Sequence, residues 1–332
     1  MAKMKTILVT GGAGFIGSNF VNYMLAKYQK YRIIVLDALT YAGSIDNFLD
    51  KVKSNKSFEF VQGNIRNAQL VNDLMKKTDI VVHFAAESHV AKSIYDNIIF
   101  FETDVLGTQT IANSVLDNKN VERFIHISSS EVYGTAETSP MDESHPLNPR
   151  SPYASAKAGA DRLVYSYYVT YGIPAIIVRP FNNYGQHQHL EKMVPRFITS
   201  AVMNKPLTVH GDGKASRDWL YVLDDCEAID KILHANLEKI KGEVFNLGTG
   251  REISIIEIAK IILKKMGKSE DMIAYTENRP GQVQRHISST NKILKSVGWK
   301  AKTKFEDGIQ TTIEWYKANT QWWEKQLWMK YY

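Results

Sequence analysis

The sequence has 332 residues, of which 44% are apolar and 23% charged, with a net charge of +6. This composition is ordinary for a globular protein that can bury a sizeable core. Its only cysteine, Cys226, excludes an intramolecular disulfide or a cysteine metal cluster and fits a reducing compartment. No dense basic run indicates nucleic-acid binding, and no stretch approaches the ~18 apolar residues of a membrane span. We therefore expect a cytoplasmic protein without a nucleic-acid or membrane partner, whose lysines are scattered over solvated faces.

Strands and helices alternate through the first half of the chain. The apolar start enters a glycine turn and so predicts a first strand, not a signal peptide. Amphipathic stretches predict helices over 15–27, 103–116 and 153–169. This alternation predicts an α/β protein with a Rossmann-type doubly wound parallel sheet. Strands are predicted at residues 6–10, 32–36, 58–62, 80–84, 123–128 and 175–179.

The composition changes near Pro180. Beyond it we expect few strands, with helices over 253–265 and 305–317 and a packed, tryptophan-rich terminal helix. We predict that residues 1–180 form an NAD-binding Rossmann domain, completed by strands returning from the C-terminal half. Residues 181–332 then form a smaller α/β lobe over the carboxyl edge of the sheet, where such folds bind ligands.

A glycine turn links the first strand to the first helix. Gly11 allows the tight turn, Gly14 lets the backbone approach a pyrophosphate, and Gly17 lets the helix pack on the sheet. The helix N-terminus offers free N–H groups to the phosphates. Asp37 ends the second strand, where its carboxylate can bind the adenosine ribose and repel a 2′-phosphate. The turn therefore predicts NAD and not NADP as the cofactor.

Tyr153 and Lys157 are spaced to lie on one face of a helix. An ammonium stabilises a phenolate, so this tyrosine could exchange protons. With the glycine turn and the serines at 128–130, the pattern resembles the extended short-chain dehydrogenase/reductase superfamily. That resemblance implies that Tyr153 is the acid/base on a sugar hydroxyl and that Ser129 binds the substrate oxygen. It also implies that Lys157 holds the nicotinamide ribose and lowers the tyrosine pKa.

The resemblance extends over nearly the whole chain and is closest to the dTDP-glucose 4,6-dehydratases. It implies an NAD-dependent nucleotide-sugar dehydratase, a lyase of polysaccharide biosynthesis that acts as a homodimer. The matching stretches are 39–43 (LTYAG), 85–90 (AAESHV), 131–134 (EVYG), 182–185 (NNYG), 191–192 (EK), 217–222 (RDWLYV), 279–281 (RPG), 315–316 (WY) and 322–323 (WW).

The same resemblance implies the residues of the site. Those expected to contact the cofactor are Gly11, Gly14, Phe15, Ile16, Gly17, Asp37, Asn64, Ile65, Ala85, Ala86, Tyr153 and Lys157. Those expected to contact the substrate are Glu87, Ser88, Asn182, Asn183, Lys192, Arg217, Asn246 and Arg279. Asn183, Lys192, Arg217 and Arg279 would lie along the diphosphate. No metal is expected: His187 and His189 lack a third ligand, and Cys226 is expected to be buried.

The implied reaction has three parts. Tyr153 takes the proton from O4 of the sugar while C4 gives a hydride to NAD. The resulting ketone acidifies C5–H, which Glu131 removes as water leaves from C6. The hydride then returns to C6, so a 4-keto-6-deoxy sugar forms and the tightly bound NAD is regenerated. Water must be kept out of such a site.

Several positions depart from the dTDP-glucose pattern. Ser130 stands where those enzymes have Asp, so Glu131 or an ordered water must help to expel the C6 hydroxyl. Asn64 and Asp104 also differ, and 245–250 is more like UDP-sugar enzymes. The substrate is therefore expected to be dTDP-glucose or UDP-N-acetylglucosamine. UDP-glucuronate decarboxylases and sugar-nucleotide epimerases are alternatives. A non-enzymatic, NAD-sensing regulator is another, but it would not need Tyr153, Lys157 and Glu131.

Overall fold

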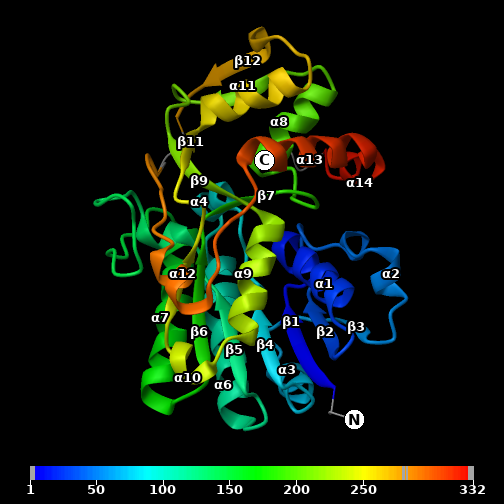
Figure 1. Cartoon of the computed structure of the whole chain (residues 1–332), viewed down its shortest axis with the longest axis vertical. Helices are drawn as coiled ribbons and strands as arrows, with labels where there is room; N and C mark the ends of the chain where they lie inside the picture. The colour runs from blue at the N-terminus through cyan, green and yellow to red at the C-terminus, as the bar shows by residue number, and fades with distance from the viewer. Residues whose placement is uncertain (1–3, 279–280, 282, 328–332) are drawn as a thin grey trace.

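A computed structural model describes residues 4–278, 281 and 283–327. Its main element is a parallel sheet in the order β10-β6-β5-β4-β1-β2-β3 (Figure 1). The strand order changes direction at β1, between β2 and β4, and this switch point is where doubly wound sheets bind ligands. The predicted fold class is confirmed. The strands are β1 Lys5–Thr10, β2 Tyr31–Asp37, β3 Phe58–Gln62, β4 Ile80–His83, β5 Arg123–Ile127, β6 Ala175–Pro180 and β10 Val244–Leu247.

Helices cover both faces of this sheet. Val9 of β1 packs in one core cluster with Phe20 of α1 (Phe15–Lys27) and Ile229 of α9 (Val222–His234). Its neighbour Leu8 packs on the opposite face with Ile111 and Val164. Because successive side chains of a strand alternate between faces, a sheet buried on both sides reads as a continuous apolar run. The second face is covered by α3 Ala68–Met75, α6 Thr108–Asp117 and α7 Pro152–Tyr171.

Two of these helices position groups of the site. Helix α7 begins where the Ser151 side chain accepts the Ala154 N–H and ends at Gly172, whose φ of 69° favours glycine. The predicted helix over 103–116 is instead divided. A π-helix, η2 (Phe101–Gly107), precedes α6 and packs along α7. Such π-helical turns are rare and are often found at functional sites.

The prediction of few strands after Pro180 was wrong. Besides β10, the structure has β7 Asn182–Tyr184, β8 Leu207–His210, β9 Ser216–Tyr221, β11 Glu252–Ser254 and β12 Ile273–Thr276. They form the small sheets β11-β9-β7 and β12-β8. These strands are only three to six residues long and mix polar with apolar positions, so no continuous apolar run predicts them.

The later residues contribute to both parts of the molecule. Strand β10 joins the large sheet, α9 packs against α1, and α12 (Asn291–Val297) packs against β10. The others build a lobe beyond the carboxyl ends of the strands (Figure 1), from α8 Met193–Val202, α11 Ile255–Lys265, α13 Phe305–Ala318 and α14 Thr320–Glu324. Buried Trp323 confirms a packed terminal helix, and Cys226 is a buried free thiol as predicted. The short helices are η1 Ile45–Asn47, α2 Asp50–Lys53, α4 Val90–Tyr95, α5 Ile98–Phe100, η3 Ser130–Tyr133, α10 Leu237–Ile240 and η4 Glu270–Met272.

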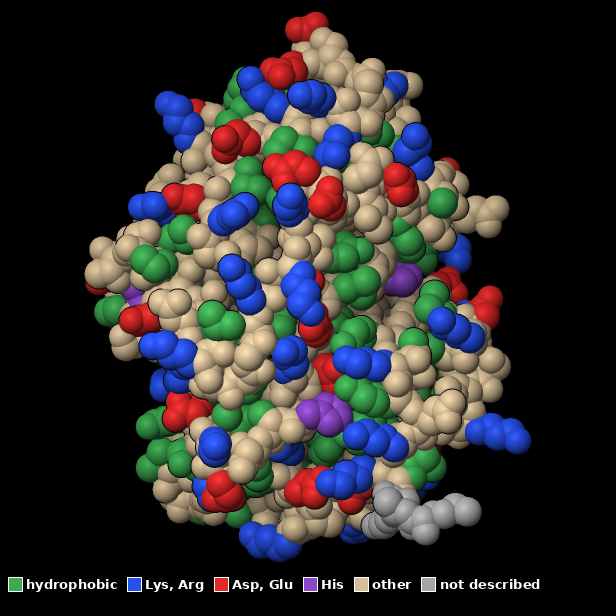
Figure 2. Space-filling view, viewed as in Figure 1, with side chains coloured by type: hydrophobic (Ala, Val, Ile, Leu, Met, Phe, Trp, Pro, Cys, Tyr) green, Lys and Arg blue, Asp and Glu red, His purple; other side chains and the backbone are tan. Residues whose placement is uncertain are grey.

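Charge is dispersed on the face drawn in Figure 2, where basic and acidic side chains alternate without a single-sign patch. Among the described residues, none of the helices is both long and apolar enough to cross a lipid bilayer.

Candidate active site

The glycine turn between β1 and α1 leaves no room for side chains. Gly11 has a φ of 67°, and a Cβ there would lie 2.5 Å from the backbone nitrogen of Ala85. A Cβ on Gly17 would lie 2.4 Å from the carbonyl oxygen of Gly11. The backbone can therefore approach a ligand closely at the N-terminus of α1, as binding of a pyrophosphate requires.

Asp37 lies at the end of β2, beside this turn. Its Oδ2 accepts the Ala13 N–H at 2.9 Å and its Oδ1 accepts the Leu39 N–H at 2.8 Å. Burial raises the pKa of this carboxyl, and the two backbone hydrogen bonds oppose that rise. Asp37 thus holds both the glycine turn and the loop after β2, and it faces the same cleft as the glycines.

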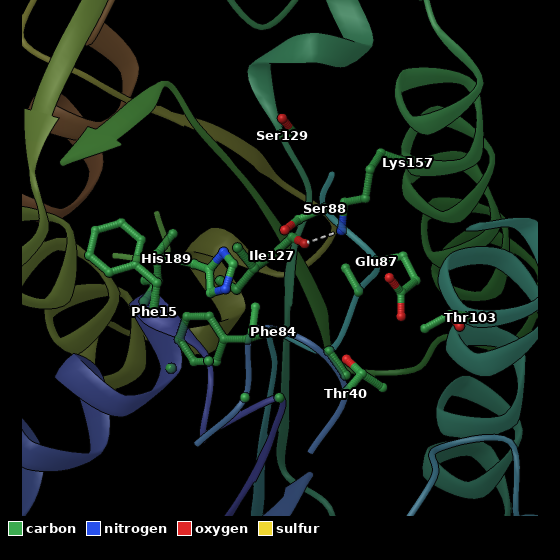
Figure 3. A pocket seen from close by; sticks show the side chains of 18 of the residues that line it. Phe15, Thr40, Phe84, Glu87, Ser88, Thr103, Ile127, Ser129, Lys157 and His189 are labelled. Atoms are coloured by element: carbon green, nitrogen blue, oxygen red, sulfur yellow. Dashed lines mark hydrogen bonds between the residues drawn. The ribbon is translucent and has the colours of Figure 1, made fainter. Parts of the chain in front are cut away.

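One cleft at the carboxyl edge of the sheet gathers the predicted cofactor residues (Figure 3). It runs from the glycine turn over the ends of β2, β4 and β5 to α7. The glycine cradle and Asp37 fit a dinucleotide with a diphosphate and an unphosphorylated adenosine ribose. All twelve predicted positions line it: Gly11, Gly14, Phe15, Ile16, Gly17, Asp37, Asn64, Ile65, Ala85, Ala86, Tyr153 and Lys157.

We expect the Asp37 carboxylate to make NAD bind more tightly than NADP, because it would repel a 2′-phosphate. Asp37→Asn keeps the shape and one acceptor oxygen but removes the charge, so it should narrow the ratio of the two dissociation constants. Titrating both cofactors into cofactor-stripped protein measures this ratio. Equal or tighter NADP binding by the unaltered protein would refute the assignment of Asp37.

The five predicted catalytic residues converge on this cleft from two elements. Ser129, Ser130 and Glu131 follow β5, and the Ser129 hydroxyl accepts the Glu131 N–H at 3.2 Å at the start of η3. Tyr153 and Lys157 come from α7, and all five line the cleft. In Figure 3, Lys157 extends from α7 toward the end of β5, where its Nζ donates to the Ile127 carbonyl at 2.7 Å.

Burial is the largest influence on the pKa values of Tyr153, Lys157 and Asp104. It raises the pKa of Tyr153, and a hydrogen bond with Ser129 opposes the rise. It lowers the pKa of Lys157, against the pull of the Asp104 and Asp161 carboxylates. Burial also raises the pKa of Asp104 in η2 to about 7, while the Lys157 ammonium acts in the opposite direction. That Lys157 lowers the pKa of Tyr153 stays a prediction, because in this structure the main opposing contact comes from Ser129.

A second hollow continues the cleft toward the smaller lobe. It shares Glu131, Asn182, Asn183 and Lys192 with the first and reaches Arg217 of β9. Glu131 therefore stands where the cofactor half meets the lobe half. Of the other predicted substrate residues, Glu87 and Ser88 also line the cleft. Arg279 lies outside the described residues.

Asn246 lies apart from the other predicted substrate residues. It is completely buried in β10 and lines neither hollow. Its Oδ1 accepts the Tyr133 hydroxyl at 2.7 Å, and its Nδ2 donates to the Met141 carbonyl at 3.1 Å. Its amide thus joins η3 to β10, and a contact of Asn246 with the substrate stays a prediction that this buried position does not support. The sequence could not distinguish these roles, because both require a buried polar side chain at a strand end.

A polar cluster around Glu191 was missed as part of the site. Tyr41 donates to Glu191 Oε1 at 3.1 Å, and the Lys192 ammonium lies 3.1 Å from the same oxygen. The ring of His89 lies 3.4 Å from Oε2. Burial would raise the pKa of Glu191, but Lys192, His89 and His189 bring it below its ordinary value. These residues fall in the matching stretches 39–43, 85–90 and 191–192, and those stretches were the available signal.

His187 packs among aromatic side chains. Its buried ring packs against Trp315, with ring centroids 4.7 Å apart. The ring of His189 instead lies edge-on to that of Tyr41. Among the described residues, no three His, Cys, Asp or Glu side chains are grouped so that they could hold a metal ion.

The fold and this site define a class of protein. A parallel dinucleotide-binding sheet, a glycine cradle with an acidic strand end, and a Tyr–Lys pair facing strand-end serines are the features of short-chain dehydrogenases/reductases. Residues 8–312 match the family model of GDP-mannose 4,6-dehydratase. The chain belongs to this family.

Its relatives agree with this assignment. The chain is 45% identical to the low-salt glycan biosynthesis protein Agl12 of Haloferax volcanii, over 95% of this chain and 99% of that protein. It is 41% identical to a trifunctional UDP-glucose 4,6-dehydratase/epimerase/reductase of Arabidopsis thaliana, RHM2. That match covers 97% of this chain but only 48% of the plant enzyme.

Solved structures resemble the chain over its whole fold. The dTDP-glucose 4,6-dehydratase DesIV of Streptomyces venezuelae, solved with NAD, has a TM-score of 0.92 and 39% identity over 97% of this chain and 99% of that one. The NAD complex of the Bacillus anthracis dTDP-glucose 4,6-dehydratase has a TM-score of 0.89 at 39% identity, with the same coverage of both chains. The sequence-based predictions of the family, the fold and an NAD-dependent nucleotide-sugar 4,6-dehydratase are confirmed.

Proposed function

We propose that this protein converts a nucleoside-diphosphate hexose to its 4-keto-6-deoxy derivative and water, with dTDP-glucose as the first candidate substrate. The observation that carries this proposal is the position of Glu131. It stands at the junction of the cofactor cleft and the lobe hollow, next to the Ser129–Tyr153 pair. A dehydrogenase acting only at C4 has no need for a second base there, whereas an elimination across C5 and C6 does.

Each side chain has one task in this scheme. Tyr153 takes the proton from O4, and Ser129, which is hydrogen-bonded to this tyrosine, also binds O4. NAD, when bound, accepts the hydride from C4 and later returns it to C6. Glu131 removes the proton at C5, and Ser130, which is buried beside it, contributes no ionisable group. Glu131 or an ordered water therefore assists departure of the C6 hydroxyl.

The lobe half of the cleft supplies groups for the nucleotide. Lys192 and Arg217 face it with positive charge, and Asn182 and Asn183 add amides. Guanidinium and ammonium groups match diphosphate oxygens. The similar proteins include both dTDP-glucose and UDP-glucose dehydratases, so a UDP-sugar, including UDP-N-acetylglucosamine, is the second candidate.

A panel of nucleotide sugars tests the proposal. Purified protein is incubated with dTDP-glucose, UDP-glucose, UDP-N-acetylglucosamine, a GDP-sugar, a CDP-sugar and UDP-glucuronate, and the products are identified by mass and NMR. We expect loss of one water with the carbon count unchanged. Release of carbon dioxide from UDP-glucuronate, without turnover of any C6 alcohol, would replace the dehydratase with a decarboxylase. Inversion at C4 without water loss would indicate an epimerase.

We further propose a homodimer formed through η2–α6 and α7. These elements pack side by side, yet Leu106 and Val169 are 52% and 61% exposed, and Ile98 and Phe101 extend the same apolar set. Two such faces can cover each other across a two-fold axis. Sedimentation at micromolar concentration should show a dimer, and the pair Leu106→Glu and Val169→Glu should make it monomeric. A monomeric unaltered protein would contradict this; Leu294→Glu, at an exposed leucine on α12, is the control.

A further inference from the structure

An extended segment, residues 283–289, crosses the boundary between the two halves of the molecule; we refer to it as the strap. On one side it bonds to β9: Ser216 N–H donates to the Gln284 carbonyl at 2.9 Å, and His286 N–H donates to the Ser216 carbonyl at 3.2 Å. On the other side it bonds to the loop after η3, where Met141 N–H donates to the Ile287 carbonyl at 2.8 Å. The strap therefore ties the substrate lobe to the loop that follows Glu131.

Both ends of the strap are anchored by residues of β9. Arg217 Nη2 donates to the Val283 carbonyl at 2.6 Å. The buried carboxylate of Asp218 accepts the Ser288 N–H at 3.1 Å and the Ser288 hydroxyl at 2.5 Å. Arg217 also faces the lobe hollow, where the diphosphate is expected. One arginine thus connects that hollow to the start of the strap.

His286, in the middle of the strap, reaches the turn that carries the proposed base. Its Nε2 forms a hydrogen bond to the Gly134 carbonyl. Gly134 ends η3, and its own N–H donates to the Glu131 carbonyl at 3.2 Å. Gly134 has a φ of 72°, and a Cβ there would lie 2.0 Å from the Asn148 carbonyl oxygen, so only glycine fits at this position.

The described part of the chain holds His286 through one nitrogen of its ring. The residue is completely buried, and since a carbonyl can only accept, Nε2 carries the proton and Nδ1 is unprotonated. Nδ1 has no hydrogen-bond partner among the residues that the structure describes. Burial lowers the pKa of the His286 ring, the Glu131 carboxylate and the hydrogen bond to the Gly134 carbonyl act against this, and the positive charge of Arg217 adds to the lowering.

We propose that His286 is a positioning residue for the C5 base: through Gly134 it holds η3, and hence Glu131, in register with the nucleotide-binding side of the cleft. The expected effect of His286 on C5 deprotonation rests on the proposed function. Its expected effect on the order of the η3 turn does not. His286 lines neither hollow, so it acts through the turn and not on the substrate.

The test compares His286→Leu, which removes the donor, with His286→Gln, whose amide can still donate to Gly134. Hydrogen exchange of the backbone amides over 131–134 should accelerate about tenfold in the leucine variant and much less in the glutamine variant. With dTDP-glucose and UDP-glucose, deuterium wash-in at C5 should slow about 10- to 100-fold in His286→Leu while the first reduction of NAD keeps its rate. Arg285→Ala is the matched control, since its exposed side chain pairs with Glu252 on the outer side of the strap.

Each outcome decides something. Unchanged amide exchange in His286→Leu overturns the inference whether or not the protein is a dehydratase. Faster exchange at 131–134 with unaltered C5 wash-in overturns the catalytic half, as does an equal loss at both chemical steps. If the leucine variant does not fold, the test uses His286→Gln alone. A wild-type rate of C5 deuterium wash-in at wild-type KM in this variant supports positioning. Complete loss of C5 wash-in in a folded glutamine variant contradicts it. Inactivity of the unaltered protein on every sugar would count against the proposed function. Amide exchange at residues 131–134 would still test whether His286 holds the η3 turn.

Discussion

Replacing Glu131 with glutamine is expected to stop the reaction after oxidation at C4 and to slow turnover about 10²–10⁴-fold. The amide keeps the shape of the side chain, and the backbone bond from Glu131 N–H to Ser129 is unaffected. Tyr153 and Lys157, which act at O4, lie on α7 and are not altered. The variant should therefore reduce its bound NAD at the normal rate and accumulate the reduced cofactor. Stopped-flow absorbance follows that first step, and deuterium wash-in at C5 follows the second.

Ser130→Ala is the matched control for Glu131→Gln. Both residues belong to η3, but the serine carries no group that ionises, so its loss should cost far less. Ser130→Asp adds an acid at the same position and could raise the rate of water loss if that side chain faces C6. If Glu131→Gln exchanges C5 deuterium at the wild-type rate, the base is a different residue and the assignment fails.

Arg179→Met is expected to lower the free energy of unfolding by about 1.5–3 kcal/mol, because it removes two charge-assisted hydrogen bonds from the buried Asp161 carboxylate and leaves Arg162 as its only cationic partner among the described residues. Arg179 of β6 donates to both oxygens of Asp161, at 2.8 and 2.9 Å, and the two side chains are 2% and 0% exposed. Its third donor reaches the Tyr133 hydroxyl at 2.9 Å. Burial would raise the pKa of Asp161, but Arg179, together with Arg162, holds that pKa well below its ordinary value.

This ion pair also has a place in the architecture of the site. Asp161 lies one helical turn after Lys157 on α7, and Tyr133 lies two residues after Glu131. The network therefore joins the element with the Tyr–Lys pair to the turn with the base. Urea unfolding at pH 7 measures the change. Arg32→Met, which breaks the exposed pair with Glu59, is the control and should cost no more than about 1 kcal/mol. A similar small cost for both variants would show that the buried pair does not support the fold.

Much of the first domain could be predicted from the sequence. Strands β1, β2, β4, β5 and β6 are largely buried and mostly apolar, and their apolar runs therefore predicted them to within one residue of their ends. The glycine turn could also be predicted from the sequence, because only glycine fits at Gly11 and Gly17, where a Cβ would lie 2.4–2.5 Å from backbone atoms. The Tyr153–Lys157 pair followed from helical spacing. In each case the physical cause is local, so a short stretch of chain carries the whole signal.

The smaller lobe and the far side of the site were decided by tertiary structure. Strands β7, β8, β9, β11 and β12 pair with partners distant in the chain, such as Ile253 beside Arg217, and most of them are too short for a periodic pattern to predict them. Asn246 and Arg179 are polar residues at the ends of buried strands, and sequence alone cannot tell whether such a group faces a ligand or another side chain. The contact of His286 with Gly134 joins residues 152 positions apart. The sequence by itself determined the sheet, the cofactor turn and the family chemistry, because those depend on local spacing; only the tertiary structure decided which polar groups meet, because burial and partnership exist only in the folded chain.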